Sequence, residues 1–366
     1  MPRLLAAFPL LIALLAAPAS GQPTSATSVS GTVRDAQGQP LPGASVYLSG
    51  TTRGAASGGD GRFRIEAVAP GTYRLVGSMV GFKPAGHVVR LAPGTAVTVD
   101  LALAEATAPL APVAVEAQAD RRWQRMLARF RRTLLGESAN ADSTRILNPE
   151  VLDLRSRRGT LEATALAPLV IENRALGYRL HYDLTEFRAG ATAFRYGGDE
   201  VFEALVPASA AEAFRWAAAR RRAWRGSLQH LMRSLLGGSE GSEGFVLETP
   251  APRPFLTRRD EPGQAVTSKQ LVRTVDGVPT LLVADELEVL YNGEPEDERY
   301  PGSAWFLEHR GRADSVQHSR LTVEGGAAAL NPDGTSVDPF AVTARGHMAF
   351  ERLADRVPRD FLPLPE

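Results

Sequence analysis

The chain has 366 residues, of which 44% are hydrophobic and 22% are charged, so it is long enough for two domains and too apolar to be disordered throughout. Its 41 basic and 41 acidic residues balance, so the overall charge indicates no polyanionic partner, and nucleic acid is not expected among its partners. Cysteine is absent, which excludes disulfides, thiolate nucleophiles and zinc sites with cysteine ligands.

The first 21 residues have the pattern of a signal peptide that is removed on export. Arg3 supplies a positive charge, an apolar stretch runs from Leu4 to Ala17, and Ala17-Pro18-Ala19 matches the small residues at which such peptides are cut. The apolar stretch is shorter than the about 20 residues of a membrane-spanning helix. We therefore expect cleavage near Ala19 and a location in the periplasm, at the outer-membrane periphery or at the cell surface.

Residues 27–104 predict a sandwich of short antiparallel strands, because short apolar runs are separated by glycine, proline and aspartate. Alternate residues in three of these runs would line one buried face, and Tyr73 is expected to be one of these core residues. The glycine-rich stretch 50–61 lacks the arrangement of a phosphate-binding loop and is expected to be a hairpin loop. The turn positions, where glycine allows positive φ and proline pre-sets φ, are Gly38, Pro42, Gly43, Asp60, Gly61, Pro70 and Gly71.

The same segment resembles a known family in four linked motifs. They are Gly31-Thr32-Val33, the run from Gly38 to Ala44, Asp60-Gly61-Arg62-Phe63 and Pro70-Gly71-Thr72-Tyr73. In order and spacing they are similar to the carboxypeptidase-regulatory-like (transthyretin-like) domain. The resemblance implies an all-β, prealbumin-like sandwich of about seven strands, used as an accessory module beside peptidases and at the start of outer-membrane proteins.

Residues 105–120 are rich in alanine, proline and threonine and predict a linker, with a possible short strand at Val113-Ala114-Val115. Residues 121–366 predict an α+β domain of unknown function with a largely antiparallel sheet. A hairpin is expected from Tyr178 to Tyr196, with its turn at Ala189-Gly190. Further strands are expected at Gln270–Thr274, Thr280–Leu290, Ala304–His309 and Ser315–Val323.

Two amphipathic helices are expected in this domain, the first ending at Gly136 and the second running from near Ala208 to Gly237. Arginines flank the apolar stripe of each helix. These basic faces could contact an anionic membrane or polysaccharide, or they could be solvated faces of helices that pack through their apolar stripes, which is the commoner case. The stripes contain Trp123, Met126, Leu127, Phe130 and Leu134, and Phe214, Ala217, Ala218, Arg221, Trp224, Leu228, Leu231 and Leu235.

Most of residues 121–360 also resembles the C-terminal region that follows regulatory-like domains in exported proteins of Bacteroidetes-type bacteria. Matching segments include Ile146-Leu147-Asn148-Pro149-Glu150, Gly226 to His230 and Phe350 to Asp355. This family has no known function, so the resemblance transfers no active site. A cysteine often found before the first of these segments is replaced here by Thr144 or Arg145.

A zinc carboxypeptidase is disfavoured, because none of the six histidines has a glutamate three residues later and no HExxH occurs. His347 and Glu351 stand at i and i+4, where an ordinary helix contact is a more common explanation than a metal site. We expect no metal and no cofactor.

The segment Gly237-Gly238-Ser239-Glu240-Gly241 satisfies GxSxG, but it follows a predicted helix instead of a strand, so a catalytic role for Ser239 is disfavoured. Neither Lys83 nor Lys269 belongs to an SxxK motif. Asp183 with Glu186, and the acidic residues from Glu294 to Glu298, are expected to be solvated carboxylates. Asn331-Pro332-Asp333-Gly334 is expected to be a β-turn without calcium.

The sequence therefore favours an exported, non-enzymatic cell-envelope protein. In it an accessory β-sandwich accompanies a domain that binds an unknown envelope protein or glycan. One alternative is an extracytoplasmic hydrolase of peptide or glycan with its site in the second domain. Another is an accessory partner of an outer-membrane transporter. No catalytic residue is assigned.

Overall fold

The computed structural model describes residues 27–106, 121–190, 193–249, 263–303 and 314–363. The expected signal peptide, the possible strand at Val113-Ala114-Val115 and the expected strand at Ala304–His309 lie outside these residues.

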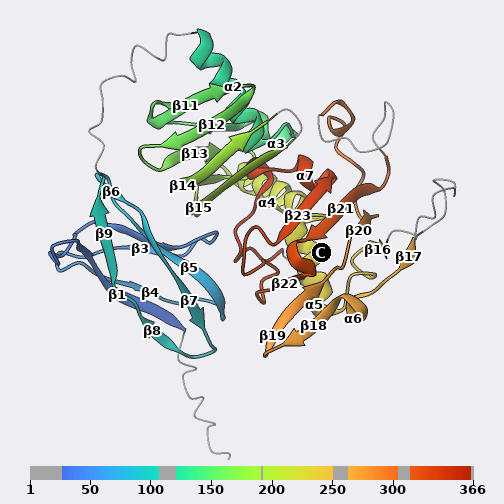
Figure 1. Ribbon diagram of the computed structural model, residues 1–366, viewed down its shortest axis with the longest axis horizontal. Helices are drawn as coiled ribbons and strands as arrows, with labels where there is room; N and C mark the ends of the chain where they lie inside the picture. The colour runs from blue at the N-terminus through green and yellow to red at the C-terminus, as the bar shows by residue number, and fades with distance from the viewer. Residues whose placement is uncertain (1–26, 107–120, 191–192, 250–262, 304–313, 364–366) are drawn as a thin grey trace, which may run out of the picture.

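The N-terminal residues form a β-sandwich, shown in blue and cyan in Figure 1. One sheet has the order β4-β1-β9-β6, with β8 beside β1, and the other has the order β3-β2-β5-β7. The structure thus has nine strand segments where the family resemblance implied about seven, because it adds the short pieces β6 and β8. The strands are β1 (Ser28–Asp35), β2 (Ser45–Leu48), β3 (Gly54–Ala56), β4 (Arg62–Ile65), β5 (Gly71–Ser78), β6 (Phe82–Lys83), β7 (Ala85–Leu91), β8 (Ala96–Thr98) and β9 (Leu101–Glu105).

Alternation along each strand decides which side chains enter the sandwich core. In β4, Phe63 and Ile65 are buried while the arginines between and before them are exposed. Tyr73 is buried in the same core, as expected, and its hydroxyl donates a hydrogen bond to the carbonyl oxygen of Ala69 at 3.0 Å. The remaining residues of the predicted buried face, Val46, Leu48 and Leu75, also belong to this core.

The turns use glycine where the backbone needs it. Gly61 has a φ of +75°, and a Cβ on it would lie 2.6 Å from the carbonyl oxygen of Val33, so only glycine fits there. Gly38 and Gly43 also have positive φ. The stretch 50–61 is not one hairpin loop, since its middle residues form β3 and pair with β2. The expectation failed because strand pairing outweighs the weak intrinsic strand preference of glycine and alanine.

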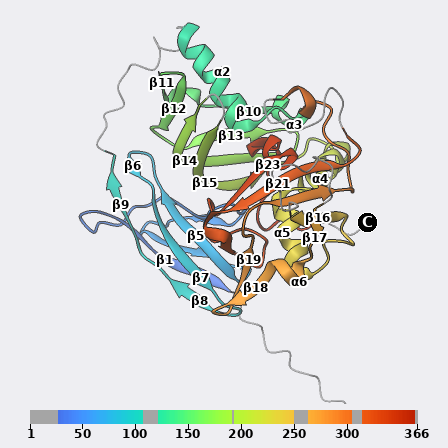
Figure 2. The ribbon, with the colours of Figure 1, turned by 45° about the vertical axis from the view of Figure 1, so that its right-hand side comes forward.

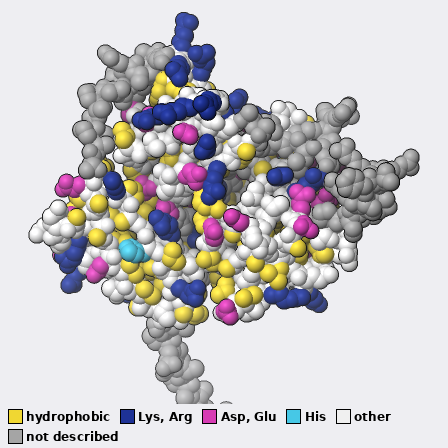
Figure 3. All heavy atoms as spheres, in the orientation of Figure 1, with side chains coloured by type: hydrophobic (Ala, Val, Ile, Leu, Met, Phe, Trp, Pro, Cys, Tyr) yellow, Lys and Arg dark blue, Asp and Glu magenta, His cyan; other side chains and the backbone are white. Residues whose placement is uncertain are grey.

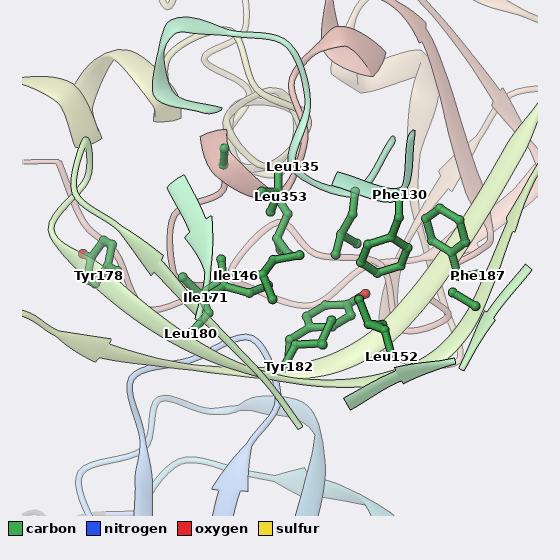
Figure 4. Packing of buried hydrophobic residues seen from close by; sticks show 14 of the residues in the cluster. Phe130, Leu135, Ile146, Leu152, Ile171, Tyr178, Leu180, Tyr182, Phe187 and Leu353 are labelled. Atoms are coloured by element: carbon green, nitrogen blue, oxygen red, sulfur yellow. The ribbon is translucent and has the colours of Figure 1, made fainter. Parts of the chain in front are cut away.

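The second half begins with an antiparallel sheet of order β10-β13-β14-β12-β11, with β15 paired along β14. The predicted hairpin is present as β14 and β15. Figure 4 shows the core on one side of this sheet and strands of the sandwich beyond its other side. The elements are α2 (Arg121–Leu135), α3 (Ala139–Asp142), β10 (Thr144–Ile146), β11 (Leu152–Arg157), β12 (Thr160–Ala165), β13 (Leu169–Asn173), β14 (Tyr178–Ala189), β15 (Phe194–Ala204) and α4 (Ala210–Trp224).

A second antiparallel sheet, of order β17-β16-β20-β21-β23, and the small sheet β18-β19-β22 enclose another core with α5 (Figure 2). The expected strand at 270–274 begins instead as the short helix α6, and the expected strand at 280–290 is divided between β19 and β20. The elements are α5 (Leu228–Gly237), β16 (Phe245–Thr249), β17 (Gln264–Ala265), α6 (Ser268–Leu271), β18 (Val272–Val275), β19 (Val278–Leu282), β20 (Leu287–Tyr291), β21 (Gln317–Val323), β22 (Ala327–Ala329), β23 (Val342–Gly346) and α7 (His347–Phe350).

The second expected helix is two helices, because the chain turns at Gly226. This glycine has a φ of +73°, and a Cβ on it would lie 2.3 Å from the side-chain oxygen of Gln317. Ser227 then caps α5 by accepting a hydrogen bond from the backbone N–H of His230 at 3.2 Å. The predicted single stripe is therefore divided. The prediction is wrong for Phe214, which is 75% exposed, because the buried face of α4 is the neighbouring one with Trp216, Ala219 and Ala223. Of the predicted stripe, Trp224 enters the first core of the second half, and Leu231 and Leu235 enter the other.

Candidate functional site

Ser239 is not part of a nucleophile elbow. It follows α5, and its hydroxyl lies 3.5 Å from a carboxylate oxygen of Glu243. The other carboxylate oxygen of Glu243 lies 3.1 Å from Nε2 of His230. The glutamate therefore stands between the serine and the histidine, whereas nucleophilic activation requires a direct hydrogen bond from serine to histidine.

His230 has a structural role between two cores. Its Nδ1 accepts the backbone N–H of Gly226 at 3.1 Å, so Nε2 carries the proton that is donated to Glu243. The ring packs 3.9 Å from the ring of Trp224 and 4.8 Å from the ring of Phe245, measured between centroids. Burial lowers the pKa of His230, although Glu243 opposes this shift, so the neutral form is favoured.

His347 and Glu351 lie close together, with Nδ1 and Oε1 4.0 Å apart. Nε2 of His347 accepts the backbone N–H of Asp297 at 3.1 Å, so the neutral ring carries its proton on Nδ1, and neither nitrogen offers a metal a lone pair. Burial lowers the pKa of His347 to about 4 and raises the pKa of Glu351. Within the described residues, no group of three histidine, aspartate or glutamate side chains is arranged to hold a metal ion.

The candidate carboxylate pair Asp183 and Glu186 is separated by a β-bulge between Leu184 and Glu186. Asp183 is buried toward the sandwich, while Glu186 forms an exposed ion pair with Arg195 at 3.1 Å. The expectation that both are solvated is thus wrong for Asp183. In the Glu294–Glu298 segment, Glu296 is also buried. Each carboxylate of the candidate pair therefore has a structural partner, Tyr47 for Asp183 and Arg195 for Glu186.

The sequence did not reveal the contact between the sandwich and the second half. Tyr182 of β14 faces the core, so Asp183 faces the opposite side, where its carboxylate accepts a hydrogen bond from the hydroxyl of Tyr47 of β2. Burial raises the pKa values of both groups, and the Tyr47 hydrogen bond partly opposes the rise at Asp183. Arg74 of β5 forms an ion pair with Asp199 of β15 at 2.8 Å.

Backbone groups reinforce this contact at the edge of β15. The N–H of Gly50 donates to the carbonyl oxygen of Glu200 at 2.6 Å, and the N–H of Phe202 donates to the carbonyl oxygen of Thr51 at 2.9 Å. The β2–β3 turn of the sandwich therefore covers an edge that would otherwise expose unpaired backbone groups.

The C-terminal segment 356–361 also contacts the sandwich and holds it against the second half. Its Arg359 forms an ion pair with Asp333 at 2.7 Å, donates to the carbonyl oxygen of Thr72 and lies over the ring of Tyr73. Arg233 of α5 donates to the carbonyl oxygens of Asp333, Arg359 and Phe361. The turn at Asn331–Gly334 thus joins the sandwich to the second half, since Asn331 also accepts the backbone N–H of Thr72 at 3.0 Å.

The exposed side of helix α2 is strongly basic. The helix contains six arginines and no acidic residue. Trp123, Phe130 and Leu134 are buried against the sheet, and the opposite side is exposed. Arg129 ties α2 to the β11–β12 turn by donating to the carbonyl oxygen of Gly159 at 2.8 Å. We define the basic face as the exposed arginines of α2 and of this turn, namely Arg121, Arg122, Arg125, Arg131, Arg132, Arg157 and Arg158.

Figure 3 shows basic side chains gathered over α2, at the top of the molecule. A shallow hollow of about 390 Å³ lies at the end of the helix, lined in part by Arg131, Arg132, Glu137 and Asp142. Its two acidic side chains already have partners, since Glu137 pairs with Arg132 at 3.5 Å and Asp142 pairs with Arg299 at 2.8 Å.

The second predicted basic helix does not offer an equivalent surface. Arg220 donates to the carbonyl oxygens of Leu176 and Gly177 and lies over the ring of Tyr178. Arg233 is engaged by the C-terminal segment, and Arg225 pairs with Glu294 at 3.7 Å. Most of these arginines thus stabilise the fold, a role that only the tertiary contacts reveal.

Comparison with known proteins confirms the family that the four motifs of the sandwich predict. Residues 28–104 match the family model of the carboxypeptidase regulatory-like domain, so the sandwich is a domain of that family. No curated protein matches the sequence. The resemblance of residues 121–360 to the Bacteroidetes-type region stays a prediction. None of the described helices is long and apolar enough to cross a membrane.

Solved structures match only weakly. A catechol 1,2-dioxygenase from Acinetobacter sp. is 12% identical, with a TM-score of 0.19 over 24% of this chain and 55% of that one. A minor pilin of Streptococcus agalactiae is 17% identical, with a TM-score of 0.21 over 24% of this chain and 48% of that one. A putative carbohydrate binding protein from Bacteroides uniformis is 10% identical, with a TM-score of 0.19 over 49% of this chain and 77% of that one. This chain therefore spans about half the length of the first two structures.

Proposed function

For a chain whose residues 28–104 form a carboxypeptidase regulatory-like domain, we propose the role of an exported, non-enzymatic cell-envelope protein. In this proposal the sandwich is an accessory module that is fixed to the second half, and the second half carries the surface that binds an envelope component. The buried contact between Tyr47 and Asp183 is the main support, because it holds the sandwich against the second half instead of leaving it free as a separate spacer.

Two further observations support a binding role over catalysis. The candidate serine and the candidate histidine–glutamate pair are arranged for structural contacts, and the seven arginines of the basic face are exposed. The N-terminal 21 residues support export through their charge and apolar pattern.

The proposal can be tested by expressing the full chain with a C-terminal tag in a Gram-negative host. We expect intact mass spectrometry to show removal of about the first 21 residues, and fractionation to place the protein outside the cytoplasm. The tagged protein should also recover a protein or glycan from envelope extracts. An uncleaved protein that stays in the cytoplasm would overturn export, and recovery of neither partner class would overturn the binding role.

A further inference from the structure

The basic face has a regular geometry. Arg121, Arg125 and Arg132 follow one another at helical spacings of four and seven residues, so they form a single row opposite the buried Phe130. The first turn of α2 contains no acidic residue, and the positive end of the helix dipole therefore adds to the charge of these arginines.

The neighbouring turn adds another arginine beside α2 at a conformational cost. Arg158 and Gly159 form the two-residue loop between β11 and β12, with φ values of +48° and +81°. Such a loop favours asparagine or aspartate followed by glycine, since a residue with a long side chain is strained at positive φ. An arginine in the strained position places a further positive charge beside α2, because Arg129 fixes this turn against the helix.

We propose that the basic face binds the phosphate groups of anionic lipid headgroups at a membrane surface. The guanidinium group is well suited to phosphate, because its planar fork can donate two parallel hydrogen bonds. This proposal rests on the proposed function in one respect, namely that the protein works at the envelope, where such lipids occur.

The shape of the face favours a lipid surface over an acidic polysaccharide. Carbohydrate and other small ligands usually bind in concave sites lined by aromatic rings, and the aromatic residues of α2 are buried: Trp123 is only 9% exposed and Phe130 is fully buried. A row of exposed charges along a helix instead suits a broad surface of many phosphates. Because its apolar stripe is occupied by the core, α2 can contact headgroups but cannot insert into the bilayer.

The test compares binding of the purified full chain to vesicles of phosphatidylcholine alone and to vesicles that also contain phosphatidylglycerol. The neutral vesicles measure any contribution of the apolar N-terminal stretch, and the difference between the two measures the charge-dependent part. We expect stronger binding to the anionic vesicles, abolished in about 1 M NaCl, where the Debye length is about 3 Å. Trp123 emission should not shift on binding, because the helix stays packed.

Substitutions of arginines test whether the basic face is the surface that binds the vesicles. Each arginine near an anionic membrane contributes about fivefold in affinity, so R121Q/R125Q should weaken the charge-dependent binding about 25-fold. R158N should weaken it about fivefold while raising stability toward urea, because asparagine suits positive φ better than arginine does. This variant separates loss of binding from loss of folding. The matched control R215Q/R222Q, which removes two exposed arginines from α4, should change binding less than about twofold.

Equal binding to neutral and anionic vesicles would overturn the proposal, as would a loss of binding in the α4 control equal to that in R121Q/R125Q. Binding to an acidic polysaccharide but not to the vesicles would also overturn it, while leaving the proposed envelope function intact. Competition by inorganic phosphate beyond that of sodium chloride at equal ionic strength would assign the face to free phosphate and likewise overturn the lipid assignment. Failure of export in the earlier test would not alter the vesicle result.

Discussion

The hydroxyl of Tyr47 donates a hydrogen bond to the carboxylate of Asp183, although the two residues are 136 positions apart in the chain. Both side chains are buried, at 2% and 6% exposure, so this bond is made where water cannot replace it. It joins a strand of the sandwich to the central hairpin of the second half.

Replacing Tyr47 by phenylalanine should reduce the free energy of unfolding by about 1–3 kcal/mol, because the buried carboxylate of Asp183 loses its main hydrogen-bond donor. Urea denaturation measures this loss. In the cycle with D183N, the double variant should lose less than the sum of the single losses. Strict additivity would show that the two groups do not interact.

Arg359 is expected to couple unfolding of the sandwich to unfolding of the second half. All four tryptophans lie after residue 120, so tryptophan fluorescence reports on the second half, whereas far-ultraviolet circular dichroism reports on both. The two signals should change together in the unmodified protein.

The variant R359A breaks an ion pair whose side chains are each 15% exposed. We expect it to lose about 3 kcal/mol of the free energy of unfolding and to unfold in two separate transitions. The control R53A, which removes a more exposed partner of Asp360, should change stability by less than about 1 kcal/mol. Coincident transitions in R359A would contradict the coupling.

Gly226 should tolerate no side chain. In G226A the alanine would adopt a positive φ and its Cβ would lie 2.3 Å from Gln317 and 2.8 Å from Tyr291, so we expect a loss of at least about 3 kcal/mol. The control G159A also places alanine at positive φ but has no atom within 4 Å of the new Cβ, so its cost should be about 1 kcal/mol. Similar losses in urea denaturation for the two variants would argue against the close approach at Gly226.

Two buried groups should give opposite dependences of stability on pH. Burial raises the pKa of Asp355 to about 6, although Ser138 and Asn140 donate hydrogen bonds to it, so between about pH 4 and 6 the folded chain holds a proton that the unfolded chain has released. Stability from this group falls as pH rises through that window, by about 3 kcal/mol. His347, with a pKa of about 4, acts in the opposite sense: stability is lost as pH falls from about 6.5 to 4, because the unfolded chain takes up a proton first.

These two effects nearly cancel in the unmodified protein and appear in single variants. We expect D355N to lose more stability than the unmodified protein on acidification below about pH 6, because the opposing contribution of Asp355 is gone, and H347N to gain stability relative to the unmodified protein over the same range. The measurement is the free energy of unfolding in urea at several pH values. Parallel pH profiles for both variants would contradict the assignment.

The sandwich can be predicted from the amino-acid sequence, because the patterns that specify it are local. Glycines at tight turns, such as Gly61, and alternating residues, such as Phe63 and Ile65, act within a few positions of themselves, and these patterns also match the family model. The first basic helix and the β14–β15 hairpin follow equally from spacing along the chain.

Which of these features are available for function depends on contacts between distant parts of the chain. Helical periodicity could not show that Gly226 divides one apolar stripe between two cores, because the reason is the approach of Tyr291 and Gln317. It also could not show that Arg220 and Arg233 donate hydrogen bonds to backbone carbonyl oxygens while Arg121 and Arg125 are exposed. The partners of charged and buried polar side chains are distant in sequence, as in Tyr47 and Asp183, and local patterns carry no information about contacts of that range.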